Sequence, residues 1–155
     1  VISNTMVLRE ISFSELWEVM SCLEVTAAQH AAQRARQDDL DLIAQNLEDT
    51  ETALANNQSV VELDIAFHDL VAKAANNRAL ELTREPLSQL FFPAFSNVMS
   101  NIGAGDRLLA AHRKIYEALC QHDAHMATEW MEKHIVDFRR GYDLANLDID
   151  EPIQP

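Results

Sequence analysis

Turn-forming residues are scarce in this sequence of 155 residues, which contains only 3 glycines and 4 prolines. Folds rich in strands need more such residues to build their turns, so the composition favours helices. Cysteine is rarer still, and Cys22 and Cys120 do not form a CxxC pair. We expect both to be small buried hydrophobic residues in a protein of a reducing compartment.

Long apolar runs and basic stretches are also absent. No apolar run reaches the roughly 18 residues needed to cross a membrane, and the first residues lack the features of a signal peptide. We therefore expect a protein of the cytoplasm with no membrane contact. The 12 basic and 25 acidic side chains give a formal charge of −13. Because this charge repels phosphate, the chain by itself should not hold DNA or RNA.

What the sequence does contain is helical periodicity. Apolar residues recur every three or four positions, as in the stripe Leu16, Met20, Leu23, Ala27 and His30. The patterns predict helices over residues 12–37, 39–55, 60–75, 79–84, 87–100, 106–121 and 124–145. Short connections favour antiparallel neighbours, so the predicted fold is all-α, an antiparallel helical bundle of six to seven helices.

Several residues suit the starts of these helices. Asp38 or Asp39 can cap the second, and Ser59 with Glu62 has the form of a capping box for the third. Pro86 suits the first turn of a helix over residues 87–100, and Asp106 can cap the next one. The prolines and acidic residues of 148–155 predict a frayed acidic tail.

One candidate for chemistry is the pair Asp64 and His68. The spacing of four residues stacks both side chains on one face of a helix, where a carboxylate and an imidazole can share a metal ion. Helices contain many such pairs, and most of them are solvated surface residues. The flanking residues Leu63, Phe67 and Val71 indicate that this face is at least partly covered.

A second pair, His112 and His134, strengthens the case. Asp123 lies midway between them, inside a predicted turn, so the two histidines should sit at the same height in an antiparallel hairpin. Both lie among apolar residues at helical spacing, and a buried imidazole must be hydrogen-bonded or coordinated. Metal binding by all four residues and a set of satisfied core histidines both remain open on this pattern.

The other three histidines are weaker candidates. His30 lies on the inner stripe of the first helix, where we expect a core histidine with a hydrogen bond, and a contact with a ligand of the metal site is the alternative. His122 and His125 flank the predicted turn and should be exposed.

Several segments together resemble a known family. They are Glu15-Leu16-Trp17-Glu18-Val19, Leu23-Glu24, Asp64-Ile65-Ala66-Phe67-His68, Ala74-Ala75-Asn76-Asn77-Arg78-Ala79-Leu80, and the stretch from His112-Arg113-Lys114-Ile115 to Met131 and His134. The pattern is similar to the FadR-type C-terminal ligand-binding domain (FCD) of GntR-type bacterial transcription regulators, over roughly residues 12–140.

The resemblance implies a dimeric helical bundle that follows an N-terminal winged helix-turn-helix domain, through which alone DNA would be bound. It implies one divalent metal ion, with Zn or Ni expected, held by Asp64, His68, His112 and His134. A small carboxylate effector would bind beside the metal. Residues 1–11 would be the remnant of a linker, and residues 12–147 the effector-binding and dimerisation domain. The broad apolar face of residues 87–99 agrees with a homodimer.

One position departs from the family pattern. Many relatives carry an arginine where this chain has Met20, and such an arginine would clamp a carboxylate with two hydrogen bonds. Arg84, Asn97 and Arg113 are candidates for effector contacts instead, from their placement alone. Two further functions remain open: a mononuclear metalloenzyme on a helical bundle, and a purely structural dimerisation module.

Overall fold

A computed structural model of the chain describes residues 4, 6, 9–102 and 104–153, with side chains for all of these except residues 93–102. Six helices account for most of this part of the chain, which contains no strand. They are α2 (Phe13–Arg34), α3 (Gln37–Ala55), α4 (Val61–Ala74), α5 (Arg78–Ile102), α6 (Gly105–Cys120) and α7 (Ala124–Leu144). The predicted all-α bundle is confirmed.

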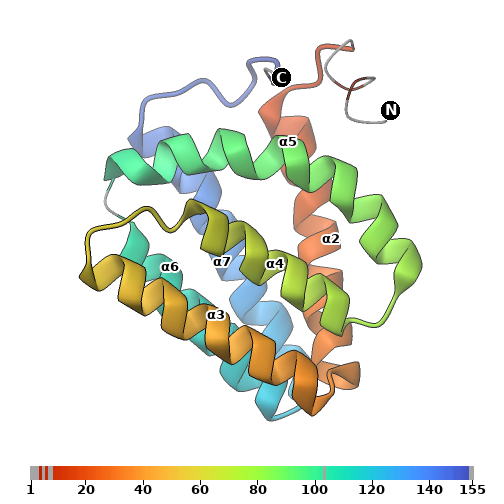
Figure 1. The fold of residues 1–155 in the computed structure, drawn as a ribbon. Helices are drawn as coiled ribbons and strands as arrows, with labels where there is room; N and C mark the ends of the chain where they lie inside the picture. The colour runs from red at the N-terminus through yellow and green to blue at the C-terminus, as the bar shows by residue number, and fades with distance from the viewer. Residues whose placement is uncertain (1–3, 5, 7–8, 103, 154–155) are drawn as a thin grey trace.

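Helix α2 is the central element, and it contacts α4, α5, α6 and α7. A capping box starts it, because Ser12 Oγ accepts a hydrogen bond from the Glu15 N–H and the Glu15 carboxylate accepts one from the Ser12 N–H. Its inner face carries four fully buried alanines: Ala27, Ala28, Ala31 and Ala32. Such small side chains let neighbouring helices approach closely, and Figure 1 shows α2 running through the bundle beside α7.

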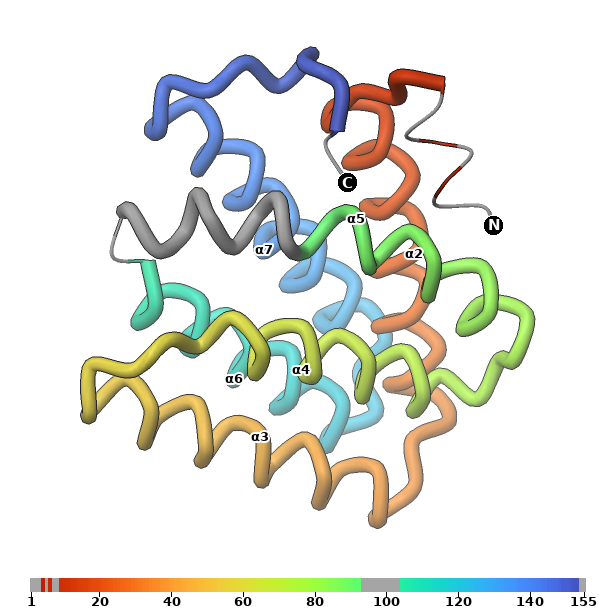
Figure 2. The backbone as a smooth tube through the Cα atoms, turned by 45° about the horizontal axis from the view of Figure 1, so that its top comes forward, coloured from red at the N-terminus to blue at the C-terminus, as the bar shows by residue number. Residues whose placement is uncertain are grey.

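Two helical hairpins pack around α2. Helices α3 and α4 run side by side, as do α6 and α7, and both views show the two pairs (Figures 1 and 2). The turns use residues in the left-handed region, with φ of 53° at both Asn57 and His122. Asp123 then caps α7 by accepting a hydrogen bond from the Met126 N–H. This α6–α7 turn is the one predicted from His122 and Asp123.

The structure corrects the prediction for Pro86. In place of a short helical turn and a separate helix, α5 runs without interruption from Arg78 to Ile102, with Pro86 in its interior. A proline there removes one backbone hydrogen bond, but the residues on either side stay helical because Leu80, Leu87, Phe91 and Phe92 are buried in the core. Figure 1 shows α5 as a bent helix lying across α2 and α7.

Two other predicted helix starts also differ, whereas α4 starts where expected but without its predicted capping box. Helix α3 begins at Gln37 after Arg36, one residue before the predicted caps. Val60 precedes α4 without a side-chain cap, although Ser59 Oγ accepts a 3.4 Å hydrogen bond from the Val61 N–H. Helix α6 begins at Gly105, so the predicted cap Asp106 lies inside its first turn. A Cβ atom at Gly105 would overlap the side chain of Leu54, so the absence of a side chain lets α6 approach α3.

The carboxyl-terminal segment returns to the start of α2. The Ser14 and Phe13 N–H groups donate to the carbonyls of Ile149 and Glu151, and the Ile153 N–H donates to that of Ile11. Ile153 is itself buried. This pairing differs from the frayed tail expected from residue 148 onward.

Both cysteines are exposed, so the prediction of buried thiols is wrong. Cys22 lies two residues from Met20, which places it on the outer face of α2, and Cys120 is the last residue of α6. No helix in the described part of the chain is long and apolar enough to cross a membrane.

Candidate metal centre

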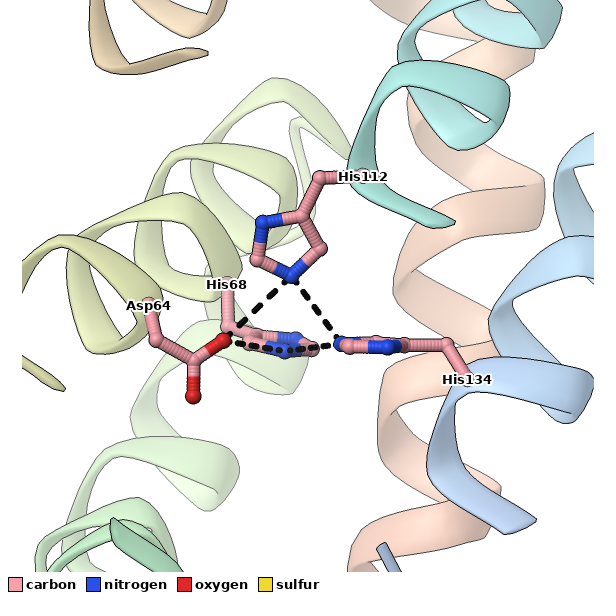
Figure 3. A group of neighbouring side chains, drawn as sticks. All are labelled: Asp64, His68, His112 and His134. Carbon is pink, nitrogen blue, oxygen red and sulfur yellow. Dashed lines mark hydrogen bonds and ion pairs between the residues drawn. The ribbon is translucent and has the colours of Figure 1, made fainter. Parts of the chain in front are cut away.

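The four predicted ligand residues converge in the middle of the bundle. Asp64 and His68 come from α4, His112 from α6 and His134 from α7, and each side chain is buried. One ligand atom from each lies within 4.8 Å of the others, and no other cluster of this kind occurs among the described residues. Figure 3 shows all four side chains pointing toward one another. The arrangement matches the expected equal height of His112 and His134 in their hairpin.

The facing atoms are three Nε2 nitrogens and one carboxylate oxygen. His134 Nε2 lies 3.0 Å from His112 Nε2 and 3.2 Å from His68 Nε2. Asp64 Oδ1 lies 3.3 Å from His112 Nε2 and 3.7 Å from His68 Nε2, yet this buried oxygen accepts no hydrogen bond. A polar atom buried in this way is destabilising unless it gains a partner.

A buried carboxylate decides where the proton of His68 lies. His68 Nδ1 is 2.8 Å from Glu24 Oε2 of α2, so Nδ1 is the donor of this hydrogen bond. In a neutral imidazole, Nε2 then carries a lone pair that faces the cluster. Glu24 Oε1 accepts from Arg84 Nε at 2.5 Å, and Arg84 Nη1 donates to Asp69 Oδ1 at 2.5 Å.

The surroundings also keep the other two imidazoles neutral. Burial lowers the pKa of His112 well below 6.5, and the neighbouring His68 adds to this effect. Burial likewise lowers the pKa of His134 far below its ordinary value, with contributions from His112 and His68. A neutral imidazole is the form that binds a metal ion.

The two carboxylates of the centre behave differently. Burial raises the pKa of Asp64, because few positive groups compensate for the lost hydration. Burial would also raise the pKa of Glu24, but Arg84 and His68 outweigh it and hold this pKa below its usual value. Glu24 is therefore a buried anion, and a cation beside Asp64 would stabilise a second one.

Aromatic rings enclose the cluster. Phe67 stacks on His112 with ring centroids 3.6 Å apart, Phe92 lies against His68 at 4.8 Å, and Phe138 meets His134 at 4.5 Å. These rings limit the access of water and keep the local dielectric low, which strengthens every charge interaction inside.

These observations fit a bound divalent metal. At most one proton can lie between His134 Nε2 and each neighbouring Nε2, and Asp64 Oδ1 has no donor. One cation would satisfy all four atoms at once. Three imidazole nitrogens and one carboxylate oxygen suit borderline ions such as Zn²⁺ and Ni²⁺.

Two of the three predicted effector residues, Arg84 and Arg113, are not members of this cluster. Arg84 is buried and donates hydrogen bonds to Glu24 and Asp69, so it is linked to His68 through Glu24. Arg113 lies on the surface, where it pairs with Glu51 at 2.8 Å. The side chain of Asn97 lies outside the described residues. Met20, at the position of the family's arginine, is fully buried.

The remaining histidines divide between correct and wrong predictions. His122 and His125 are exposed, as expected. His30 is half-buried, and its buried Nδ1 atom has no hydrogen-bond partner, so the predicted core hydrogen bond through this nitrogen is not formed.

The sequence contained a signal for Glu24 that the prediction did not use. Glu24 lies four residues after Met20 and three before Ala27, which puts a carboxylate on the apolar stripe of α2. Its side chain is 0% exposed. A charged residue at such a position needs a partner, and here it has two.

A groove between α6 and α7 reaches the cluster. It has a volume of about 360 Å³, and His134 forms part of its lining. Three cationic side chains also line it, namely Arg107, Lys114 and Lys133, together with a single anion, Asp137. Each of these cations is paired with a carboxylate, because Arg107 contacts Asp137, Lys114 contacts Glu117 and Lys133 contacts Glu129, so the groove carries little net positive charge.

Known proteins are similar to this chain in sequence and in fold. The family model described as FCD domain matches residues 15–137. The chain is 25% identical over 154 residues to the HTH-type transcriptional regulator LutR of Bacillus subtilis (strain 168), an alignment that covers 94% of this chain and 70% of that protein. It is 27% identical over 130 residues to the Glc operon transcriptional activator of Escherichia coli (strain K12), covering 78% of this chain and 51% of that protein.

A solved structure agrees with these sequence comparisons. Streptococcus agalactiae GntR has a TM-score of 0.72 and 27% sequence identity, covering 86% of this chain and 60% of that one. The chain thus spans 51% to 70% of the length of these three relatives.

Proposed function

Because the chain belongs to the FCD domain family, we propose that it senses a small effector for a GntR-type transcription regulator, whose N-terminal domain binds the DNA. Relatives named as transcriptional regulators support this proposal. They also favour it over the metalloenzyme that the sequence left open. The signal would pass from the effector site to a DNA-binding domain that precedes this one.

The proposed sensor contains one divalent metal ion, Zn²⁺ or Ni²⁺, held by Asp64, His68, His112 and His134. The observation that carries this proposal is the convergence of four buried ligand atoms within 4.8 Å, one of them without any hydrogen bond. When bound, the ion would supply Lewis acidity and open coordination positions. The chain itself orients the imidazoles and excludes water.

The proposed effector is a small carboxylate that binds beside the metal. An ion held by four protein ligands would keep open coordination positions, and carboxylate oxygens are suitable ligands for such positions. Met20 replaces the arginine of many relatives and offers no hydrogen bond. The metal should therefore carry more of the effector affinity here than it does in those relatives.

Two alanine variants test the metal and the effector together. We expect His112→Ala and His134→Ala to lose bound metal, to unfold at a lower temperature, and to lose affinity for acetate and small dicarboxylates. His125→Ala is the matched control, because this histidine is exposed and should leave all three measurements unchanged.

The outcomes separate three functions. Wild-type metal content in both variants would remove the site and leave a structural dimerisation module. Loss of metal with unchanged carboxylate affinity would make the ion structural and refute effector sensing through the metal.

We also propose a homodimer. The family resemblance and the apolar pattern of residues 87–99 support it, although Leu87, Phe91 and Phe92 are themselves buried in the core of one chain. Sedimentation equilibrium should give twice the chain mass at micromolar concentration. A monomer at high micromolar concentration would contradict this proposal.

A further inference from the structure

Glu24 is the one acidic side chain of α2 that is fully buried, and both of its oxygens are engaged. Oε2 lies 2.8 Å from His68 Nδ1, and Oε1 lies 2.5 Å from Arg84 Nε. The two contacts come from different helices, α4 and α5, so they fix the rotation of the carboxylate. The group sits behind His68, on the side of the ring away from the cluster.

We propose that Glu24, held by Arg84, is a positioning residue that prepares His68 to bind the metal. Glu24 accepts a hydrogen bond from the Nδ1–H of His68, so the lone pair of the neutral imidazole is on Nε2, facing Asp64, His112 and His134. This inference rests on the proposed metal-binding function. It gives the buried ion pair between Glu24 of α2 and Arg84 of α5 a role in metal affinity.

Two physical effects would follow from the carboxylate. The hydrogen bond fixes the tautomer and the plane of the imidazole, so less entropy is lost when the metal binds. The negative charge also increases the electron density on Nε2, which makes it a stronger ligand. A neutral acceptor would provide the first effect and little of the second.

Arg84 has a separate task. An unpaired carboxylate at this depth would be strongly destabilising, and one contact alone would leave it free to rotate away from His68. Arg84 is 2% exposed and pairs with both Glu24 and Asp69, and its guanidinium carbon lies 5.6 Å from the ring centroid of Phe92. It therefore holds the Glu24 carboxylate in line with His68.

The competing interpretation is a buried ion pair that only joins helices α2, α4 and α5. Such a pair would contribute to folding without affecting the metal. The two interpretations differ when both charges are removed together, because replacing a whole buried ion pair is often neutral or stabilising.

The experiment compares E24Q, the double variant E24Q/R84M and the control I43A. Glutamine keeps an acceptor for the Nδ1–H but loses the charge. Ile43 is fully buried on α3, which supplies no ligand, so I43A reports the effect of a destabilised core alone. The measurements are Zn²⁺ affinity by competition with a chelator, the visible spectrum of the Co²⁺ form, and the thermal midpoint of the metal-free protein.

For E24Q we expect a Zn²⁺ affinity about 10- to 100-fold weaker than that of the wild type, and shifted Co²⁺ bands. The double variant should recover thermal stability relative to E24Q but keep the weaker affinity and the altered spectrum. I43A should lose stability and keep wild-type affinity. If E24Q does not fold, the double variant carries the same comparison.

Wild-type Zn²⁺ affinity and an unchanged Co²⁺ spectrum in the double variant would overturn the inference and leave a structural ion pair. A wild-type protein that binds neither ion would instead refute the proposed function, and this inference with it.

Discussion

At the scale of single residues, the centre depends on imidazoles that stay neutral in a dry interior. His112 and His134 are buried beside each other and beside His68, so protonating either would place a charge in a poorly solvated site. Asp64 faces the same atoms with one oxygen that lacks any donor. A metal ion and a proton therefore compete for the same lone pairs.

The lowered pKa values of His112 and His134 predict that the stability of the protein depends on pH even without metal. The pKa of His112 and of His134 lies well below 6.5 in the folded protein, so below about pH 6.5 the unfolded chain binds more protons. The free energy of unfolding of the metal-free protein should then fall as pH drops, by up to about 1.4 kcal/mol per pH unit for each imidazole. Urea unfolding across this range measures it.

A pair of matched variants tests whether the buried histidines cause this pH dependence. His134→Ala should reduce the slope, whereas His125→Ala should keep it. Asp64 acts in the opposite direction, because its raised pKa lets the folded protein bind a proton before the unfolded chain does. A free energy of unfolding that does not change between about pH 7 and pH 5.5 would contradict the prediction.

At the scale of the helices, local sequence signals determine where some helices begin, and packing determines where the others begin. Helix α2 begins at the capping box of Ser12 and Glu15, and α7 begins after its cap Asp123. Helices α4 and α6 start without any side-chain cap, at residues held by their neighbours. Helix α5 continues through Pro86 because its apolar residues are buried on both sides.

The cap of α2 is open to a direct test. Ser12→Ala removes the acceptor for the Glu15 N–H, and a lost cap of this kind costs about 1 kcal/mol. Urea denaturation should show this loss, with little change in bound metal. Ser14→Ala, two residues further along the chain, keeps the cap and should differ less from the wild type. Equal destabilisation by both variants would assign the effect to something other than capping.

At the scale of the whole molecule, the proposed ion would join three helices. Asp64 and His68 belong to α4, while His112 and His134 belong to α6 and α7. An unfolded chain has no preformed site, so the binding energy of the metal adds to folding stability. The same centre contacts α2 through Glu24.

We therefore expect removal of metal by a chelator to lower the thermal midpoint, and re-addition of Zn²⁺ to restore it. At a free metal concentration about 100-fold above Kd, the stabilisation is about 2.7 kcal/mol. His134→Ala should show no response to chelator, which controls for effects of the chelator itself. An unchanged midpoint in the wild-type protein would argue against a tightly bound ion.

The charge of the molecule gives a further prediction. With a net charge of −13, the isolated chain should not bind duplex DNA at physiological salt. A mobility-shift assay with the isolated chain measures this. Binding that weakens as the salt concentration rises would show a basic surface that the composition does not reveal, and would contradict this prediction.

Much of the architecture could be predicted from the sequence, because the signals for helices and turns are local. Apolar spacing and turn residues determine where helices form and which face is buried, and these signals lie within a few positions of one another. The hairpin symmetry about Asp123 even placed His112 level with His134. Helix ends were less predictable, since Pro86 and Asp106 gave local signals that packing overrode.

The sequence by itself determined an acidic helical bundle and four residues able to share a metal. Only the tertiary structure decided which partners surround them. Glu24 meets His68 and Arg84 across 44 and 60 positions of sequence, and the tail segment pairs with the start of α2. No local pattern encodes such contacts, because they depend on how the helices pack. Packing also turned Arg84 inward while leaving Arg113 on the surface.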